Sequence, residues 1–181
     1  MGKPKEAKQA KLFMSLIVSD DDILHQGMRD VTQAFGGIDF VSERYPFRFT
    51  SYYAPEMGEA LFRRFITFER LISIPFLPEI KHTTNRLEEK HAASNGNRRI
   101  NIDPGYLCLV HVILATTKGY THRPYIRDGI YADLTLIFRN KSFQALEWTY
   151  PDYRELEVIR LFNQFRKTYL EVLKGGGQHL C

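Results

Sequence analysis

The residues of this sequence that are best suited to chemistry lie between positions 98 and 153, where charged side chains alternate with aliphatic and aromatic ones. In the stretch RINID (99–103), a strand would place Arg99, Asn101 and Asp103 on one face and both isoleucines on the other. A guanidinium, an amide and a carboxylate on one surface can bind an anion or orient the polar groups of a ligand.

A second stretch, IYADLTL (130–136), has the same alternation and predicts a face that carries Tyr131, Asp133 and Thr135. If the two strands are neighbours in one sheet, two carboxylates come together on a shared polar surface. The pattern leaves an alternative open, because an antiparallel sheet with one face in water shows the same alternation.

Between these stretches lies a loop, ATTKGYTHRPY (115–125), whose composition is typical of a site that holds an anion. Its hydroxyl, ammonium and guanidinium groups can all donate hydrogen bonds to phosphate oxygens, and they belong to Thr116, Thr117, Lys118 and Arg123. A histidine side chain can exchange a proton near neutral pH, so His122 is the best candidate for proton transfer. Short basic loops are also common on protein surfaces, so a solvated loop is the alternative.

The candidate site therefore has two groups of residues. The candidates for catalysis are His122, Asp103 and Asp133. The candidates for ligand binding are Arg99, Asn101, Thr116, Thr117, Lys118, Arg123 and Tyr131. Asp103 and Asp133, with Glu56 or Glu88, could also hold Mg²⁺, which prefers carboxylate oxygens. No spacing in the sequence predicts a metal site, so the cofactor stays open, with magnesium as the candidate.

Familiar catalytic signatures are absent from the sequence. It contains no GxxxxGK[ST] phosphate loop, no GxGxxG after a strand, and no GxSxG, HExxH or paired CxxC motif. Cys108 lies in an apolar run, where burial favours the unreactive thiol. The sequence thus indicates where a ligand could bind, whereas a hydrolase or phosphoryl-transfer step stays open.

The composition is that of a soluble globular domain, with 44% hydrophobic and 25% charged residues. The net charge of +4 is smaller than expected for a dedicated nucleic-acid binder. The two cysteines have no spacing that suits a metal site or a disulfide framework, which indicates a reducing compartment. No run approaches the ~18 apolar residues of a membrane span. We expect a cytoplasmic protein with no membrane partner.

The order of predicted elements favours one domain of the α+β class. We expect a basic tail at 1–11, a single domain at 12–174 and a flexible tail at 175–181. A strand at 12–18 is apolar enough to be buried on both faces, and a helix capped at Ser19 or Asp20 follows it and ends at Gly36 and Gly37. Strands at 39–45 and 47–53, a hairpin tip at 54–58 and a strand at 61–69 come next.

The second half supplies the elements that must position the candidate site. A helix at 76–91 places Lys81, Asn85 and Glu88 on one stripe, which is either solvated or lines a cleft beside the sheet. Pro104 and Gly105 end the strand at 98–103, and the segment 107–115 is either strand or helix. A hairpin turns at 140–141. The aromatic residues of WTYPDY (148–153) could stack on a base, but such residues around a proline more often form a packed corner. Asp152 and Glu155 begin a C-terminal helix in the manner of a capping box.

These elements predict a ferredoxin-like βαββαβ start, an added β-hairpin and a C-terminal helix around a mainly antiparallel sheet.

The residues of several separate segments resemble a known family. They include Tyr52-Tyr53 with Glu56-Met57-Gly58, Lys81 with Thr84-Asn85 and Glu88, Asp103-Pro104-Gly105-Tyr106, Ala115-Thr116-Thr117-Lys118, His122-Arg123, and Trp148 to Tyr153. This set resembles the uncharacterised bacterial family called domain of unknown function 4416, over nearly the whole chain. The resemblance implies no established activity. Two positions depart from the family pattern, since Asp133 stands where Glu is expected and Pro124 where an aliphatic residue is expected.

The sequence leads to two hypotheses of function. In the first, the polar sheet face binds a nucleotide or another phosphorylated small molecule. In the second, the same aromatic and basic surface is a non-catalytic interaction module that docks a protein or RNA. A concave pocket lined by the named charges favours the first, and a flat exposed aromatic patch favours the second.

Overall fold

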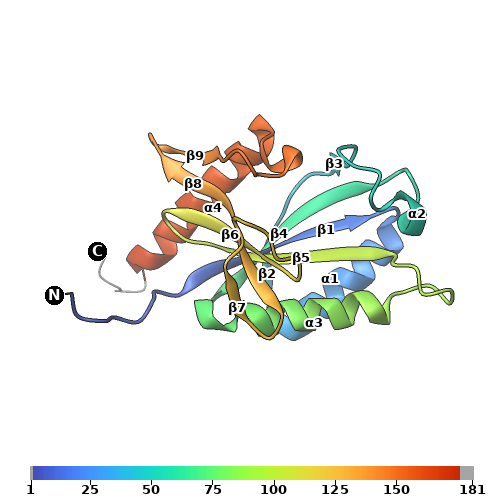
Figure 1. The fold of residues 1–181 in the computed structure, drawn as a ribbon, viewed down its shortest axis with the longest axis horizontal. Coiled ribbons are helices and arrows are strands. Elements are labelled where there is room, and N and C mark those ends of the chain that lie inside the picture. Colours follow the sequence, from blue (N-terminus) through green and yellow to red (C-terminus); the bar gives the residue numbers. More distant parts are fainter. Residues whose placement is uncertain (1, 176–181) are drawn as a thin grey trace.

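A computed structural model describes residues 2–175 of the chain as one β-sheet with helices on both faces (Figure 1). The strands are β1 (Ala10–Val18), β2 (Ile38–Val41), β3 (Tyr45–Pro46), β4 (Phe62–Ile72), β5 (Ile100–Leu107), β6 (His111–Thr116), β7 (Tyr125–Arg127), β8 (Ile130–Arg139) and β9 (Ser142–Ala145). The helices are α1 (Asp21–Phe35), α2 (Ala54–Met57), α3 (Leu77–Lys90) and α4 (Leu156–Gly175), with 3₁₀ turns at Ile74–Phe76 and Pro151–Tyr153.

The sheet confirms the predicted α+β class and its antiparallel character. Its strands follow the order β2-β4-β1-β5-β6-β8-β7, while β3 pairs with β4 and β9 pairs with β8. Within the described part of the chain, every pairing of named strands is antiparallel. The ferredoxin-like start stays a prediction, since the chain also inserts β3 and α2 between the expected elements.

The central strand β1 is buried along its whole length, as its apolar run predicts. It begins at Ala10, so Ala10 and Lys11 belong to the sheet and not to the predicted tail of residues 1–11. Lys11 is buried because its ammonium group has partners there: it bonds the Asp39 carboxylate and the carbonyl oxygen of Phe68. A buried charge is tolerated only with such partners.

The helices α1 and α3 cover one face of the sheet, where alternate residues of β1 from Leu12 to Val18 pack with them. The side chain of Asp20 caps α1 by accepting a hydrogen bond from the backbone nitrogen of Ile23 at 2.8 Å. Gly36 follows the helix with φ +100°, a conformation that favours glycine. Both ends of this helix agree with the sequence prediction.

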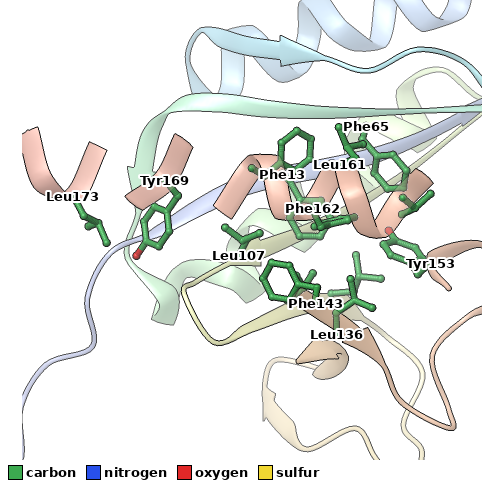
Figure 2. Close-up of a cluster of buried hydrophobic side chains, with 14 residues drawn as sticks. Phe13, Phe65, Leu107, Leu136, Phe143, Tyr153, Leu161, Phe162, Tyr169 and Leu173 are labelled. Carbon is green, nitrogen blue, oxygen red and sulfur yellow. The ribbon is translucent and has the colours of Figure 1, made fainter. Parts of the chain in front are cut away.

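The opposite face of the sheet is covered over part of its length by α4 (Figures 1 and 2). Phe162 of α4 packs edge-on against Phe13 of β1, with ring centroids 5.0 Å apart. The helix starts at Leu156, after the 3₁₀ turn, and Asp152 does not cap it as predicted. Asp152 instead forms a buried ion pair with Arg63 of β4. Gly175 still belongs to α4, and residues 176–181 of the predicted tail lie outside the described residues.

The structure corrects three further predictions. The segment 47–53 is not a strand, and residues 54–57 form the short helix α2 where a hairpin tip was expected. Strand β5 begins at Ile100 and continues through Pro104 and Gly105, which were expected to end it. The segment 107–115, for which the sequence left strand and helix as alternatives, forms the end of β5, a turn and most of β6. The predicted hairpin at 140–141 is confirmed, and Asn140 and Lys141 have positive φ. No helix in residues 2–175 has the length and apolar character to cross a membrane.

Candidate functional site

The candidate site begins where two neighbouring strands, β5 and β6, separate. They pair at Gly105–Leu107 with Val112–Leu114 and not along the first half of β5. Gly105 lies at the last paired position, where a side chain would meet the carbonyl oxygen of Ile113 and the Phe13 ring, 2.6 Å from its Cζ. Backbone groups alternate in direction along a strand, so the nitrogen of Pro104, like that of Ile102, faces the opening. Proline loses no hydrogen bond there, which explains why β5 passes through it.

Side chains of α3 take the place of the missing strand partner. Glu88 Oε1 accepts a hydrogen bond of 2.6 Å from the backbone nitrogen of Ile102. Lys81 Nζ donates to the carbonyl oxygen of Ile102 and to Asp103 Oδ1, each at 3.3 Å. The stripe Lys81-Asn85-Glu88 therefore lines a cleft, which was one of the two alternatives for it.

The opening leads into a cavity of about 640 Å³ on the face that α4 leaves uncovered. Its floor is the polar face of β5, β6 and β8, and one wall is the α3 stripe. A second wall comes from the irregular segment around α2, with Phe49, Tyr52 and Tyr53. The corner at 150–153 closes the remaining side. The cavity thus combines charged groups with aromatic rings.

Six of the predicted residues come together in this cavity. They are Asn101, Asp103, Thr116, Thr117, Lys118 and Asp133. The register places Leu114 of β6 between Gly105 of β5 and Asp133 of β8. The two carboxylates, Asp103 and Asp133, therefore lie over one sheet face but on strands separated by β6. The predicted shared surface exists, although the two strands are not direct neighbours.

Arg99 and Tyr131 do not line the cavity. Arg99 is exposed, and its guanidinium lies 3.9 Å from the carboxylate of Asp20. The alternation that grouped it with Asn101 fails because β5 begins only at Ile100. Tyr131 instead packs over Gly119, where a Cβ would lie 3.0 Å from the Tyr131 ring.

Arg123 and His122 reach the site through Asp133. Arg123 Nε donates to Asp133 Oδ2 at 2.7 Å, and its Nη2 donates to the hydroxyl of Tyr150 at 2.6 Å. The His122 ring stacks on Trp148 at 5.1 Å between centroids, and its Nε2 lies 3.6 Å from Asp133 Oδ2. Arg123 holds Asp133 in place, because a carboxylate buried this deeply requires a partner, whereas His122 Nε2 has no hydrogen-bond partner among the described residues.

Sequence reasoning missed a cation of the cavity, Arg98. Its Nε and Nη2 donate to the two oxygens of Glu56, at 2.6 and 3.0 Å, and its Nη1 donates to Asn101 at 3.3 Å. The hydrogen bond from Arg98 lowers the pKa of Glu56 below its ordinary value. Asn101 in turn donates to Asp103 at 2.6 Å, so a chain of hydrogen bonds runs from Glu56 to Asp103. Arg98 directly precedes Arg99, which was the predicted residue. Which of the two arginines lines the cavity depends on where β5 begins, and it begins at Ile100.

Arg63 and Asp152 are a second missed pair, and both line the cavity. The Arg63 guanidinium lies over the rings of Phe47 and Tyr153, at 4.9 and 5.1 Å from their centroids. Asp152 was available to the sequence analysis only as a helix cap, and no local pattern links it to a strand 89 positions earlier in the chain.

Lys118 differs from the other lining cations. Its Nζ lies 4.2 Å from the centroid of the Tyr52 ring, and it forms no ion pair with any carboxylate of the described residues. The hydrogen bond and charge of Lys118 lower the pKa of Tyr52. Lys118 is thus a positive charge at the cavity that no carboxylate neutralises.

Glu88 is the corresponding exception among the carboxylates. Burial raises its pKa to about 7, and the nearby Asp103 adds to the increase, while Lys81 and the Ile102 hydrogen bond oppose it. A carboxyl group with such a pKa can gain or lose a proton near neutral pH. The sequence pattern indicated Glu88 as a metal-ligand candidate, as part of the α3 stripe and as one of the residues that carry the family resemblance, but not as a group with a raised pKa.

The described residues hold no group of three or more His, Cys, Asp and Glu side chains that could bind a metal ion. Asp103 and Asp133 are instead tied to Lys81 and Arg123. The magnesium expectation gains no support from this geometry.

Comparison with known proteins gives one match. A family model described as Domain of unknown function (DUF4416) matches residues 8–169. No curated protein and no solved structure matches the chain.

Proposed function

The chain belongs to the family of the Domain of unknown function (DUF4416), and from this premise we propose that its cavity binds a nucleotide or another phosphorylated small molecule. The observation that carries the proposal is the position of Lys118, a lining cation without a carboxylate partner. An ammonium group without a carboxylate partner attracts an anionic group such as a phosphate. The neighbouring hydroxyls of Thr116 and Thr117 can donate hydrogen bonds to the oxygens of that phosphate.

The aromatic wall supports a ligand that carries a flat ring. Tyr52 and Phe49 line the cavity and are 53% and 42% exposed, so their surfaces are accessible to a bound molecule. Stacking of a base on such a ring contributes about 1–3 kcal/mol. A phosphate near Lys118 and a base on this wall is therefore the arrangement we propose.

The size of the cavity also fits this class of ligand. Pockets for small molecules have volumes of roughly 300–1,000 Å³ and combine apolar surface with a few polar groups. The cavity, at about 640 Å³, lies inside that range. A module that docks a protein or RNA would instead need a broad exposed surface, and the charged residues of this site face a concave one.

The proposal concerns binding and includes no reaction. We also propose that the protein is bacterial, as the family resemblance indicates, and cytoplasmic, because the spacing of the two cysteines in the sequence fits no disulfide framework.

Isothermal titration calorimetry with nucleoside mono-, di- and triphosphates and with inorganic phosphate, each with and without Mg²⁺, tests the proposal. We expect at least one nucleotide to bind, and Lys118→Met to weaken that binding at least tenfold. The matched control is Lys141→Met, which removes an exposed ammonium group in the turn between β8 and β9. An absence of heat across the whole panel, or equal losses in the two variants, would contradict the proposal.

A further inference from the structure

Glu88 is bound differently from the other carboxylates of the cavity. Glu56, Asp103, Asp133 and Asp152 each form an ion pair, with Arg98, Lys81, Arg123 and Arg63 respectively. Glu88 forms none with any residue from 2 to 175. Its hydrogen bond comes from a neutral backbone group, the Ile102 nitrogen, and the residue is only 8% exposed. An ionised carboxylate in this position is a buried charge without an ion-pair partner, which is costly.

We propose that Glu88 takes up a proton from solvent when an anionic ligand binds in the cavity, so that binding and protonation are coupled. The inference rests on the proposed function, because it names how the charge of the same site adjusts to its ligand. It adds a role for a residue to which neither the sequence motifs nor the family match assigns one.

The balance of charges at the site carries the argument. The cations that line it or touch a lining carboxylate are Arg63, Lys81, Arg98, Lys118 and Arg123. The lining carboxylates are Glu56, Glu88, Asp103, Asp133 and Asp152. Five of each give no net charge while Glu88 is ionised, and one positive charge once it is protonated. The protonated site therefore complements one negative charge of a ligand better than the ionised site does.

The groups that face Glu88 decide the direction of the coupling. Lys81 lies on the same helix, Asp103 is on β5, Arg98 precedes β5, and Tyr53 comes from the segment before α2. Burial and Asp103 favour the neutral acid, while Lys81 and Arg98 favour the carboxylate. An anion in the same cavity acts in the sense of Asp103 and drives proton uptake.

One oxygen of the Glu88 carboxylate, Oε2, is available to bind the proton. Glu88 Oε1 accepts the Ile102 N–H, whereas Oε2 has no hydrogen bond to another described residue and belongs to a side chain that lines the cavity. A proton from solvent can therefore bind to Oε2 while Oε1 keeps its backbone hydrogen bond. The change is a simple protonation of the carboxylate, and no other bond forms or breaks.

The first test needs no ligand. Carbon-13 NMR of the glutamate side-chain carboxyls follows their titration, and Glu88→Gln identifies the Glu88 signal by its loss. We expect a midpoint near 7 in the free protein. Asp103→Asn should lower this midpoint, because it removes a neighbouring negative charge, while the exposed control Asp128→Asn should leave it unchanged. A Glu88 midpoint near that of an exposed glutamate would overturn the inference.

The second test uses guanosine 5′-monophosphate as the probe, with calorimetry at pH 8 in two buffers of different ionisation enthalpy. We expect the wild-type protein to take up a fraction of a proton on binding and Glu88→Gln to take up none. Binding with no proton uptake by the wild type overturns this inference and leaves the proposed function standing. A Glu88 midpoint near 7 with no binding by the whole nucleotide panel overturns the proposed function and, with it, the coupling to a ligand.

Discussion

The two halves of one sheet face differ in how their side chains are covered. Over the half that faces α4, aromatic residues from β1, β4 and the helix interlock, with Phe13, Phe65 and Phe162 fully buried (Figure 2). Over the half where β5 and β6 separate, charged residues line a cavity.

The difference shows how one sheet can supply both stability and a site. Apolar burial stabilises the covered half at roughly 25 cal/mol per Å². In the open half, most charges are matched in pairs, such as Arg98 with Glu56 and Arg123 with Asp133, and such pairs contribute little net stability. The unmatched groups, Lys118 and Glu88, are the ones free to respond to a ligand.

The largest expected effect comes from damage to the covered half. Phe162→Ala removes a ring that contacts Phe13 and Phe65, with centroids 5.0 and 5.5 Å away. We expect the free energy of unfolding to fall by about 3–5 kcal/mol, because the substitution leaves a cavity in a close-packed cluster. Urea denaturation followed by circular dichroism measures this change.

The control for that experiment is Phe76→Ala, which removes the same type of ring from a position that is 58% exposed. A change within about 0.5 kcal/mol is expected there. If both variants lost the same stability, the claim that the close-packed cluster around Phe162 stabilises the covered half would be wrong.

A smaller effect, with a pH dependence, is expected in the open half. The pKa of Glu88 in the folded protein is about 7, above its ordinary value of 4.5. The folded state therefore binds more protons than the unfolded state between these values, and its stability falls as the pH rises through that window. The loss is on the order of 3 kcal/mol and is complete above pH 7.

Glu88→Gln should remove this pH-dependent loss, since Gln cannot ionise and its amide oxygen can still accept the Ile102 N–H. Urea unfolding at pH 5 and pH 8 compares the two proteins. We expect the variant to gain stability relative to the wild type between these two pH values. A constant difference would mean that Glu88 does not titrate in this range.

The covered half was the easier one to predict from the sequence. The continuous apolar run of β1 and the helical apolar stripe of α4 are signals that burial imposes along the whole element. The turn at Asn140 and Lys141 and the Asp20 cap depend on neighbours in the chain, so local chemistry was sufficient to identify them. The start of α4 was misplaced because Asp152 has a distant partner, Arg63.

The open half was harder to predict because it depends on an interruption of strand pairing. Alternation correctly placed Asn101 and Asp103 on one face, but it selected Arg99 where the structure uses Arg98. The choice depends on the first residue of β5, which no local pattern fixes. Tyr52 and Arg63 reach the cavity only through tertiary packing, so no local pattern placed them at the site, although Tyr52 belongs to the residues that carry the family resemblance.

The smallest expected effect sharpens the comparison within the open half itself. Lys118→Met removes a charge that makes no ion pair with a described residue, so we expect the free energy of unfolding to change by less than about 0.5 kcal/mol. The pKa of the Tyr52 hydroxyl should nevertheless rise, because the hydrogen bond and charge of Lys118 are the largest causes of its lowering. NMR titration of tyrosines labelled at Cζ measures this rise, and Lys141→Met is the matched control.

An unchanged Tyr52 pKa in Lys118→Met would mean that the ammonium group does not lie at the cavity. A marked loss of stability would mean that Lys118 belongs with the groups that hold the fold, and that the open half keeps no cation for a ligand.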